Sequence, residues 1–76
     1  MFQKNKKYVI RINKMSCEHC ATKVRTALEE LNGVKKVKID LFRGEATVKS
    51  SVSLSINEIK EKVESLGYQF ISMVEA

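Results

Sequence analysis

The feature that most constrains the fold of this chain is the way its hydrophobic period changes along the sequence. Apolar residues stand at every second position in KYVIRIN, as is typical of a strand. From Cys20 onward they recur at three- and four-residue steps, at Ala21, Val24 and Leu28, as an amphipathic helix requires. The two periods then alternate through the rest of the chain. They predict strand, helix, strand, strand, helix and strand, at residues 7–13, 20–31, 34–41, 45–49, 56–66 and 68–74.

Glycines and short polar residues separate these elements. Asn32-Gly33 predicts a left-handed end to the first helix, and Gly44 predicts the turn of a hairpin. Ser55 and Glu58 form a capping-box pattern at the start of the second helix, which Gly67 ends.

The order of these elements defines a fold class. Two strand–helix–strand units with right-handed crossovers give the ferredoxin-like βαββαβ sandwich, an α+β fold. We therefore predict a four-stranded antiparallel sheet with two helices on one face. The chain forms a single domain over residues 1–76, with a core at about 7–74, because 76 residues leave no room for a second core. The predicted core residues are Ile10, Ile12, Val24, Leu28, Leu31, Val37, Ile39, Val48, Ile59, Val63, Leu66 and Phe70.

The N-terminal segment MFQKNKK leads into no apolar stretch of signal-peptide length. No part of the chain approaches the roughly 18 consecutive apolar residues of a membrane span. These observations predict a cytoplasmic protein without membrane insertion. In a reducing cytoplasm a structural disulfide is disfavoured, and a pair of cysteines is more often catalytic or metal-binding.

The net charge of +5 is unevenly distributed along the sequence. Through Arg25 there are seven basic residues and one acid, Glu18, whereas from Thr26 onward there are seven basic and eight acidic residues. The first third therefore carries +6 and the remainder −1. A basic field around the cysteines would attract an acidic protein, a nucleic acid or an anionic membrane surface, although charge alone also fits a solvated face.

Both cysteines lie in the segment KMSCEHC, separated by two residues, on the loop after the first strand and the opening turn of the first helix. The unsatisfied N–H groups and the dipole of a helix start favour negative charge, and hence the thiolate form. Thiolate binds metals and also attacks disulfides, so this position supports both chemistries.

Three kinds of site compete for the pair. A closed structural zinc site needs four ligands, and the chain offers one Cys pair and a single histidine, His19, which we expect to point away from the site. A thioredoxin-like dithiol redox site is disfavoured, because that fold is larger and places a proline opposite its motif, whereas this chain has no proline. An open two-thiolate clamp for a soft ion, Cu(I) above all, fits best.

The segment MSCEHC, the helix ATKVRTALEELNGV, the strand VKKVKIDL and the ending LGYQF resemble the heavy-metal-associated domains, and among them the small bacterial copper chaperones. The resemblance spans roughly residues 7 to 72. It implies that Cys17 and Cys20 are the metal ligands, that Met15 anchors the loop in the core, and that Tyr68 lies beside the site. Ser16 stands where members tuned to Zn²⁺ or Cd²⁺ commonly have Asp, which favours Cu(I); Ser16 is also a candidate helix N-cap. Lys14 stands where members often have Gly.

The resemblance further implies a copper chaperone rather than an enzyme. Such a protein would carry one Cu(I) and deliver it by thiolate exchange to the metal-binding domain of a copper-transporting ATPase. A metal-binding domain of a heavy-metal ATPase, a mercury-binding relative and a metal-bridged homodimer stay open as alternatives. The candidates for docking to an acidic partner are Lys4, Lys6, Lys7, Lys14 and Lys23.

A rival from another class is an RNA-recognition module, which shares this element order. Such modules stack bases on aromatic residues of the central strands, but the third strand here offers Glu45, Ala46, Thr47 and Val48. Nucleic-acid binding would then be nonspecific and strongly salt-dependent, and no specific nucleic acid is expected.

Overall fold

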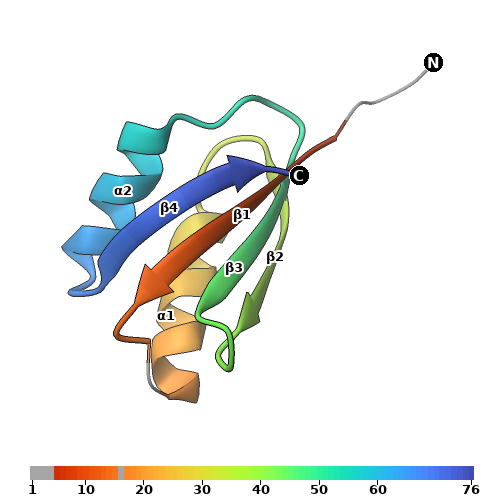
Figure 1. Ribbon diagram of the computed structural model, residues 1–76. Coiled ribbons are helices and arrows are strands. Elements are labelled where there is room, and N and C mark those ends of the chain that lie inside the picture. The colour runs from red at the N-terminus through yellow and green to blue at the C-terminus, as the bar shows by residue number, and fades with distance from the viewer. Residues whose placement is uncertain (1–4, 16) are drawn as a thin grey trace.

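The computed structural model describes residues 5–15 and 17–76, and its elements follow the order that the hydrophobic periods predict (Figure 1). The N-terminal residues 1–4 and residue 16 lie outside the described residues, and with them the predicted roles of Lys4 and Ser16. The elements are β1 (Lys6–Asn13), α1 (Glu18–Glu29), β2 (Val34–Asp40), β3 (Glu45–Ser50), α2 (Ile56–Ser65) and β4 (Gln69–Glu75).

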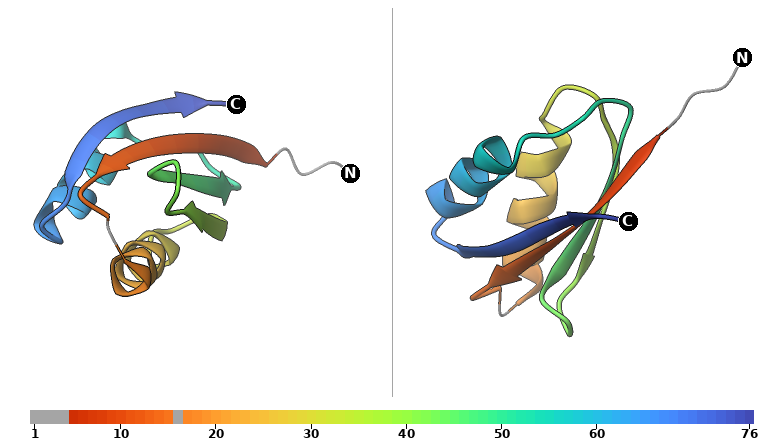
Figure 2. Two further views of the ribbon diagram at one scale, coloured as in Figure 1. Left: turned by 60° about the horizontal axis from the view of Figure 1, so that its bottom comes forward. Right: turned by 45° about the horizontal axis from the view of Figure 1, so that its top comes forward.

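The strands form one antiparallel sheet in the order β2-β3-β1-β4. Both helices cover the same face of this sheet, and the other face is left open (Figure 2). The prediction of a ferredoxin-like α+β sandwich is thus confirmed. No helix in the described part of the chain is long and apolar enough to cross a membrane.

The core lies between the sheet and the helices. Eight of the predicted core residues are buried: Ile10, Ile12, Val24, Leu28, Val37, Val48, Ile59 and Val63. The other four, Leu31, Ile39, Leu66 and Phe70, are only partly buried and pack against the core from edge strands and helix ends. The list of predicted core residues also omitted four buried hydrophobic residues, Tyr8, Met15, Ala27 and Ala46. Alanine is small and Tyr8 carries a hydroxyl, so these residues show only weakly in a hydrophobic pattern. Met15 lies in a loop outside any periodic element, and only the family resemblance had placed it in the core.

Two features of the helix starts differ from the prediction. Helix α1 begins at Glu18, two residues before the predicted start at Cys20. The hydrophobic pattern missed this start because Glu18 and His19 are polar and exposed. Ser55 is the N-cap of α2, but its side chain makes no capping hydrogen bond, so the capping box is wrong in this respect. Ser55 and Glu58 are both exposed, and water can therefore satisfy the free N–H groups there.

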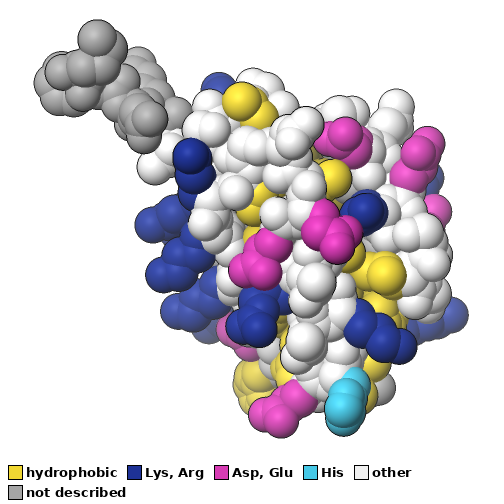
Figure 3. All heavy atoms as spheres, turned by 180° about the vertical axis from the view of Figure 1, so that it is seen from behind, with side chains coloured by type: hydrophobic (Ala, Val, Ile, Leu, Met, Phe, Trp, Pro, Cys, Tyr) yellow, Lys and Arg dark blue, Asp and Glu magenta, His cyan; other side chains and the backbone are white. Residues whose placement is uncertain are grey.

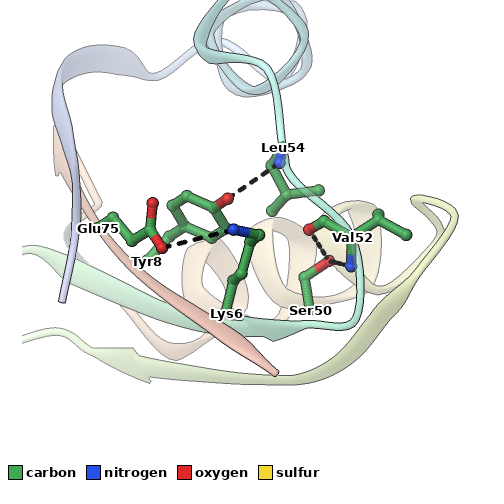
Figure 4. A network of polar contacts seen from close by, with 6 residues as sticks. All are labelled: Lys6, Tyr8, Ser50, Val52, Leu54 and Glu75. Atoms are coloured by element: carbon green, nitrogen blue, oxygen red, sulfur yellow. Dashed lines mark hydrogen bonds and ion pairs between the residues drawn. The ribbon is translucent and has the colours of Figure 1, made fainter. Parts of the chain in front are cut away.

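The connection from β3 to α2 is held by partly buried hydrogen bonds (Figure 4). The Ser50 hydroxyl donates to the Val52 carbonyl at 2.7 Å and accepts from the Val52 N–H at 3.1 Å. The Leu54 N–H donates to the Tyr8 hydroxyl at 3.2 Å. These bonds fix the end of the sheet that lies away from the loop between β1 and α1.

Candidate metal centre

The two cysteines are placed by the start of helix α1. Cys17 is the N-cap residue, with extended backbone angles (φ −150°, ψ 171°), and its carbonyl accepts the Ala21 N–H at 3.1 Å. Cys20 lies three residues further on, within the first turn. Residues three apart on a helix lie on the same side, and this spacing turns both thiols toward one another.

The Sγ atoms of Cys17 and Cys20 are 3.5 Å apart. Neither cysteine is in a disulfide; Cys17 is exposed and Cys20 is partly buried. A disulfide would require a separation of about 2.05 Å, so the pair is a dithiol whose sulfurs share a weak hydrogen bond. The arrangement can bind an ion or be oxidised, and its open side faces solvent at Cys17.

The helix start surrounds the pair with partial positive charge. The first N–H groups of an α-helix have no partner within the helix and form the positive end of its dipole. The N-cap side chain of α1 makes no capping hydrogen bond, so these N–H groups are left for solvent or for negative sulfur.

No third ligand joins the cysteines within residues 5–15 and 17–76. This part of the chain holds no group of three or more His, Cys, Asp or Glu side chains that could bind one metal ion. His19, between the cysteines, is exposed on α1. The described residues therefore provide two sulfur ligands, which does not complete a tetrahedral zinc site.

Met15 fastens the loop that precedes the cysteines. Its side chain is 8% exposed and belongs to the same buried cluster as Ile12 and Val24. Directly before it, Lys14 adopts φ +74°, the one positive φ of a non-glycine residue in the described chain. The left-handed region is strained for residues with a Cβ, which gives a physical reason for a glycine at this position in similar sequences.

Tyr68 approaches the pair from the turn between α2 and β4. Its hydroxyl hydrogen-bonds to Cys20. This bond, then partial burial, then the negative charge of the Cys20 and Cys17 thiolates raise the pKa of Tyr68 from 10.0 to about 12. Tyr68 is half-buried and also packs against the core, so it links the hydrophobic core to the thiol site.

The candidate docking lysines are not brought together. Lys6 and Lys7 lie at the start of β1, and Lys6 forms an ion pair with Glu75 at 3.8 Å. Lys14 follows the opposite end of β1, and Lys23 is exposed on α1. Of these four, Lys14 and Lys23 flank the cysteines in sequence.

These features define a small βαββαβ domain with an exposed two-thiol site at a helix start. The chain belongs to the heavy-metal-associated domain family, which it matches over residues 9–69. It is 38% identical over 61 residues to the copper chaperone CopZ of Staphylococcus haemolyticus, covering 79% of this chain and 90% of that protein.

Solved structures agree with this assignment. The fold is similar to that of a CopZ metallochaperone, with a TM-score of 0.78 and 26% identity over 86% of this chain and 98% of the other. It is also similar to a copper-binding domain of HMA7, a P-type ATPase, with a TM-score of 0.73 and 27% identity over 90% of this chain and 96% of the other.

Proposed function

We propose that this protein is a copper chaperone that binds one Cu(I) through the thiolates of Cys17 and Cys20. The observation that carries the proposal is a pair of thiols 3.5 Å apart and not joined by a disulfide, at an exposed helix start, with no third metal-binding side chain among the described residues. The similarity to bacterial copper chaperones supports copper as the cargo.

The donor set suits this ion. Thiolates select soft ions such as Cu(I), whereas Mg²⁺ and Ca²⁺ require oxygen ligands. Two sulfur–metal bonds of about 2.3 Å, as measured for zinc, would span the 3.5 Å separation in a bent arrangement. A linear arrangement requires the sulfurs to separate by about 1 Å further, which the exposed side chain of Cys17 permits.

We propose that the ion leaves by thiolate exchange. A thiolate of the partner forms a bond to the bound Cu(I), and the bond to Cys17 or Cys20 then breaks. One sulfur ligand replaces another and copper remains Cu(I), so no oxidant or reductant is needed. The similarity to a copper-binding domain of a P-type ATPase supports the metal-binding domain of a copper-transporting ATPase as the partner.

Neighbouring residues would tune the exchange. Met15, buried in the core, would hold the loop while Cys17 stays accessible. Tyr68, through its hydrogen bond to Cys20, would restrain the more buried ligand, so that Cys17 is released first. We propose that Ser16 favours Cu(I) over Zn²⁺. The residues proposed to dock an acidic partner are Lys4, Lys6, Lys7, Lys14 and Lys23. Docking through lysines predicts that transfer slows as salt rises, and salt-independent transfer would contradict it.

The test is a competition titration of the fully reduced protein with Cu(I), Zn²⁺ and Hg²⁺. We expect stoichiometric Cu(I) binding that survives excess Zn²⁺, and its loss in Cys17→Ser and Cys20→Ser. His19→Ala is the matched control between the two ligands and should bind as the native protein does. If the double serine variant held Cu(I) as well as the native protein, the proposal would fail.

A further inference from the structure

The open face of the sheet carries a cluster of four lysines that the proposed metal site does not use. In β1 and β3 the buried residues alternate with outward-facing ones, which places Lys7 and Lys49 on the side away from the helices. Lys7 pairs with Lys49, and Lys49 pairs with Lys36 of β2. In the next outward row, Lys38 pairs with Thr47. We call Lys7, Lys36, Lys38 and Lys49 the sheet lysine cluster; together with Thr47 they line one shallow hollow.

This cluster is uncompensated. Facing residues on neighbouring strands are about 4.5–5.5 Å apart at Cα, and like charges at such positions disfavour the sheet. Within residues 5–15 and 17–76, none of the four lysines forms an ion pair. The outward row beyond Lys38 and Thr47, by contrast, contains the ion pair between Arg11 and Glu45. Positive charge is therefore concentrated at one end of this face.

The cluster is built by the fold and shares only Lys7 with the basic N-terminal third of the sequence and with the proposed docking lysines. Lys36, Lys38 and Lys49 come from the part of the chain whose total charge is −1. Four of the eight acids in this part of the chain, Glu29, Glu58, Glu61 and Glu64, lie on the helices, on the other side of the sheet. Figure 3, which views the helix side, shows acidic side chains among the helices and a run of basic ones along the edge where β2 lies.

The chemistry of the face favours one class of partner. Lysine binds phosphate as a point charge, and the cluster contains no arginine to hold a carboxylate with two hydrogen bonds. Beside the lysines the outward row continues through Val9 to Val74, which is 58% exposed. These two aliphatic side chains would lose water against lipid, whereas stacking of nucleic-acid bases needs aromatic side chains.

We propose that the sheet lysine cluster adsorbs to the surface of an anionic phospholipid bilayer. Each lysine near an anionic membrane surface contributes about 1 kcal/mol of attraction, which acts over about a Debye length. Adsorption would leave the thiols free, because the Cys17 loop follows the far end of β1, about 20 Å along the strand from Lys7. The use of this surface, to hold the protein near a membrane transporter, rests on the proposed function.

The experiment measures co-sedimentation of metal-free protein with vesicles, so that its outcome does not depend on copper binding. We expect binding to vesicles of phosphatidylcholine mixed with phosphatidylglycerol, no binding to phosphatidylcholine alone, and release as salt approaches about 1 M. Lys38→Gln/Lys49→Gln should weaken binding by about 30-fold. Lys38→Arg/Lys49→Arg should retain it, and circular dichroism would verify the fold of both variants.

The matched control is Arg25→Gln/Lys60→Gln, which removes the same charge from exposed positions on the two helices. We expect this control to bind as the native protein does. Equal loss in both glutamine variants would show that net charge alone acts and would overturn the proposal, as would absence of vesicle binding. Tighter binding to duplex DNA than to the vesicles, lost through the same two lysines, would assign the surface to nucleic acid instead and would also overturn it.

Discussion

The hydroxyl of Tyr68 hydrogen-bonds to Cys20, joining the turn before β4 to the first turn of α1. This contact ties the more buried of the two thiols to the core, because Tyr68 itself packs against the buried cluster. It makes the pair asymmetric: Cys17 is exposed, whereas Cys20 is partly buried and restrained.

The contact predicts an unusual titration of Tyr68. In the reduced protein its pKa should be about 12 rather than 10.0, because its hydroxyl donates to Cys20 and the thiolates oppose a phenolate. Tyrosine NMR signals recorded against pH, assigned with Tyr68→Phe, would measure it. In Cys20→Ser the pKa should fall toward 10.

The raised pKa of Tyr68 predicts that the stability of the protein falls as pH rises above 10. Because the pKa of Tyr68 is higher in the folded state than in the unfolded state, its contribution is complete below pH 10 and is lost as pH rises through about 12. Denaturant unfolding between pH 9 and 12 should therefore show a steeper loss in the native protein than in Tyr68→Phe. Equal slopes would contradict the contact.

Removal of the Tyr68 hydroxyl should increase the rate at which Cys20 is alkylated. In a Cys17→Ser background at about pH 10, where a free thiol is mostly ionised, Tyr68→Phe should speed alkylation of Cys20 about fivefold, the value of one hydrogen bond. Tyr8→Phe is the control, since the Tyr8 hydroxyl instead accepts the Leu54 N–H. Identical rates in the two phenylalanine variants would argue against a restraint on Cys20.

Oxidation of the two cysteines should abolish Cu(I) binding. The sulfurs must approach from 3.5 Å to about 2.05 Å to form a disulfide, a small movement for the exposed Cys17. Mild oxidation should therefore remove two hydrogens as an intrachain disulfide forms, abolish Cu(I) binding, and be reversed by dithiothreitol. Mass spectrometry and Cu(I) titration of the same samples would check this, and Cu(I) binding by the disulfide form would refute the two-thiolate site.

Replacement of Lys14 by glycine should raise the free energy of unfolding. Its φ of +74° costs a residue with a Cβ about 1–2 kcal/mol, of which the greater freedom of glycine in the unfolded chain offsets about 0.5–1 kcal/mol. Lys14→Gly should thus stabilise the protein by about 0.5–1 kcal/mol in denaturant unfolding. Lys14→Ala keeps the Cβ and should give no gain; equal gains would mean that removal of charge is responsible.

Gly33 should tolerate no side chain. It adopts φ +87° after α1, and a Cβ there would overlap the side chain of Val52. Gly67, with φ +95° and nothing close to its Cβ position, is the matched control that isolates backbone strain. Gly33→Ala should therefore destabilise the protein by about 1–3 kcal/mol more than Gly67→Ala. Val52→Ala should rescue Gly33→Ala in part, and a fully additive double mutant would exclude the overlap.

The sequence by itself determined the order of elements and the position of the thiols. Hydrophobic periods are local properties, so the strand of Ile10 and Ile12 and the helix of Val24 and Leu28 could be predicted without their neighbours. The spacing of Cys17 and Cys20 is equally local, because a helix start places residues three apart on one side. Family resemblance added Met15 and Tyr68 as neighbours of the site.

Only the tertiary structure decided what depends on strand pairing and on packing between distant segments. Alternation along the strands assigns Tyr8 and Ala46 to the inner face, but their nearly complete burial follows from the central position of β1 and β3, which only strand pairing reveals. The hydrogen bond of Tyr68 to Cys20 requires the turn before β4 to lie against α1. Likewise, the register that sets Lys7, Lys49 and Lys36 in one row is a relation among three strands, and a count of charges along the chain cannot show it.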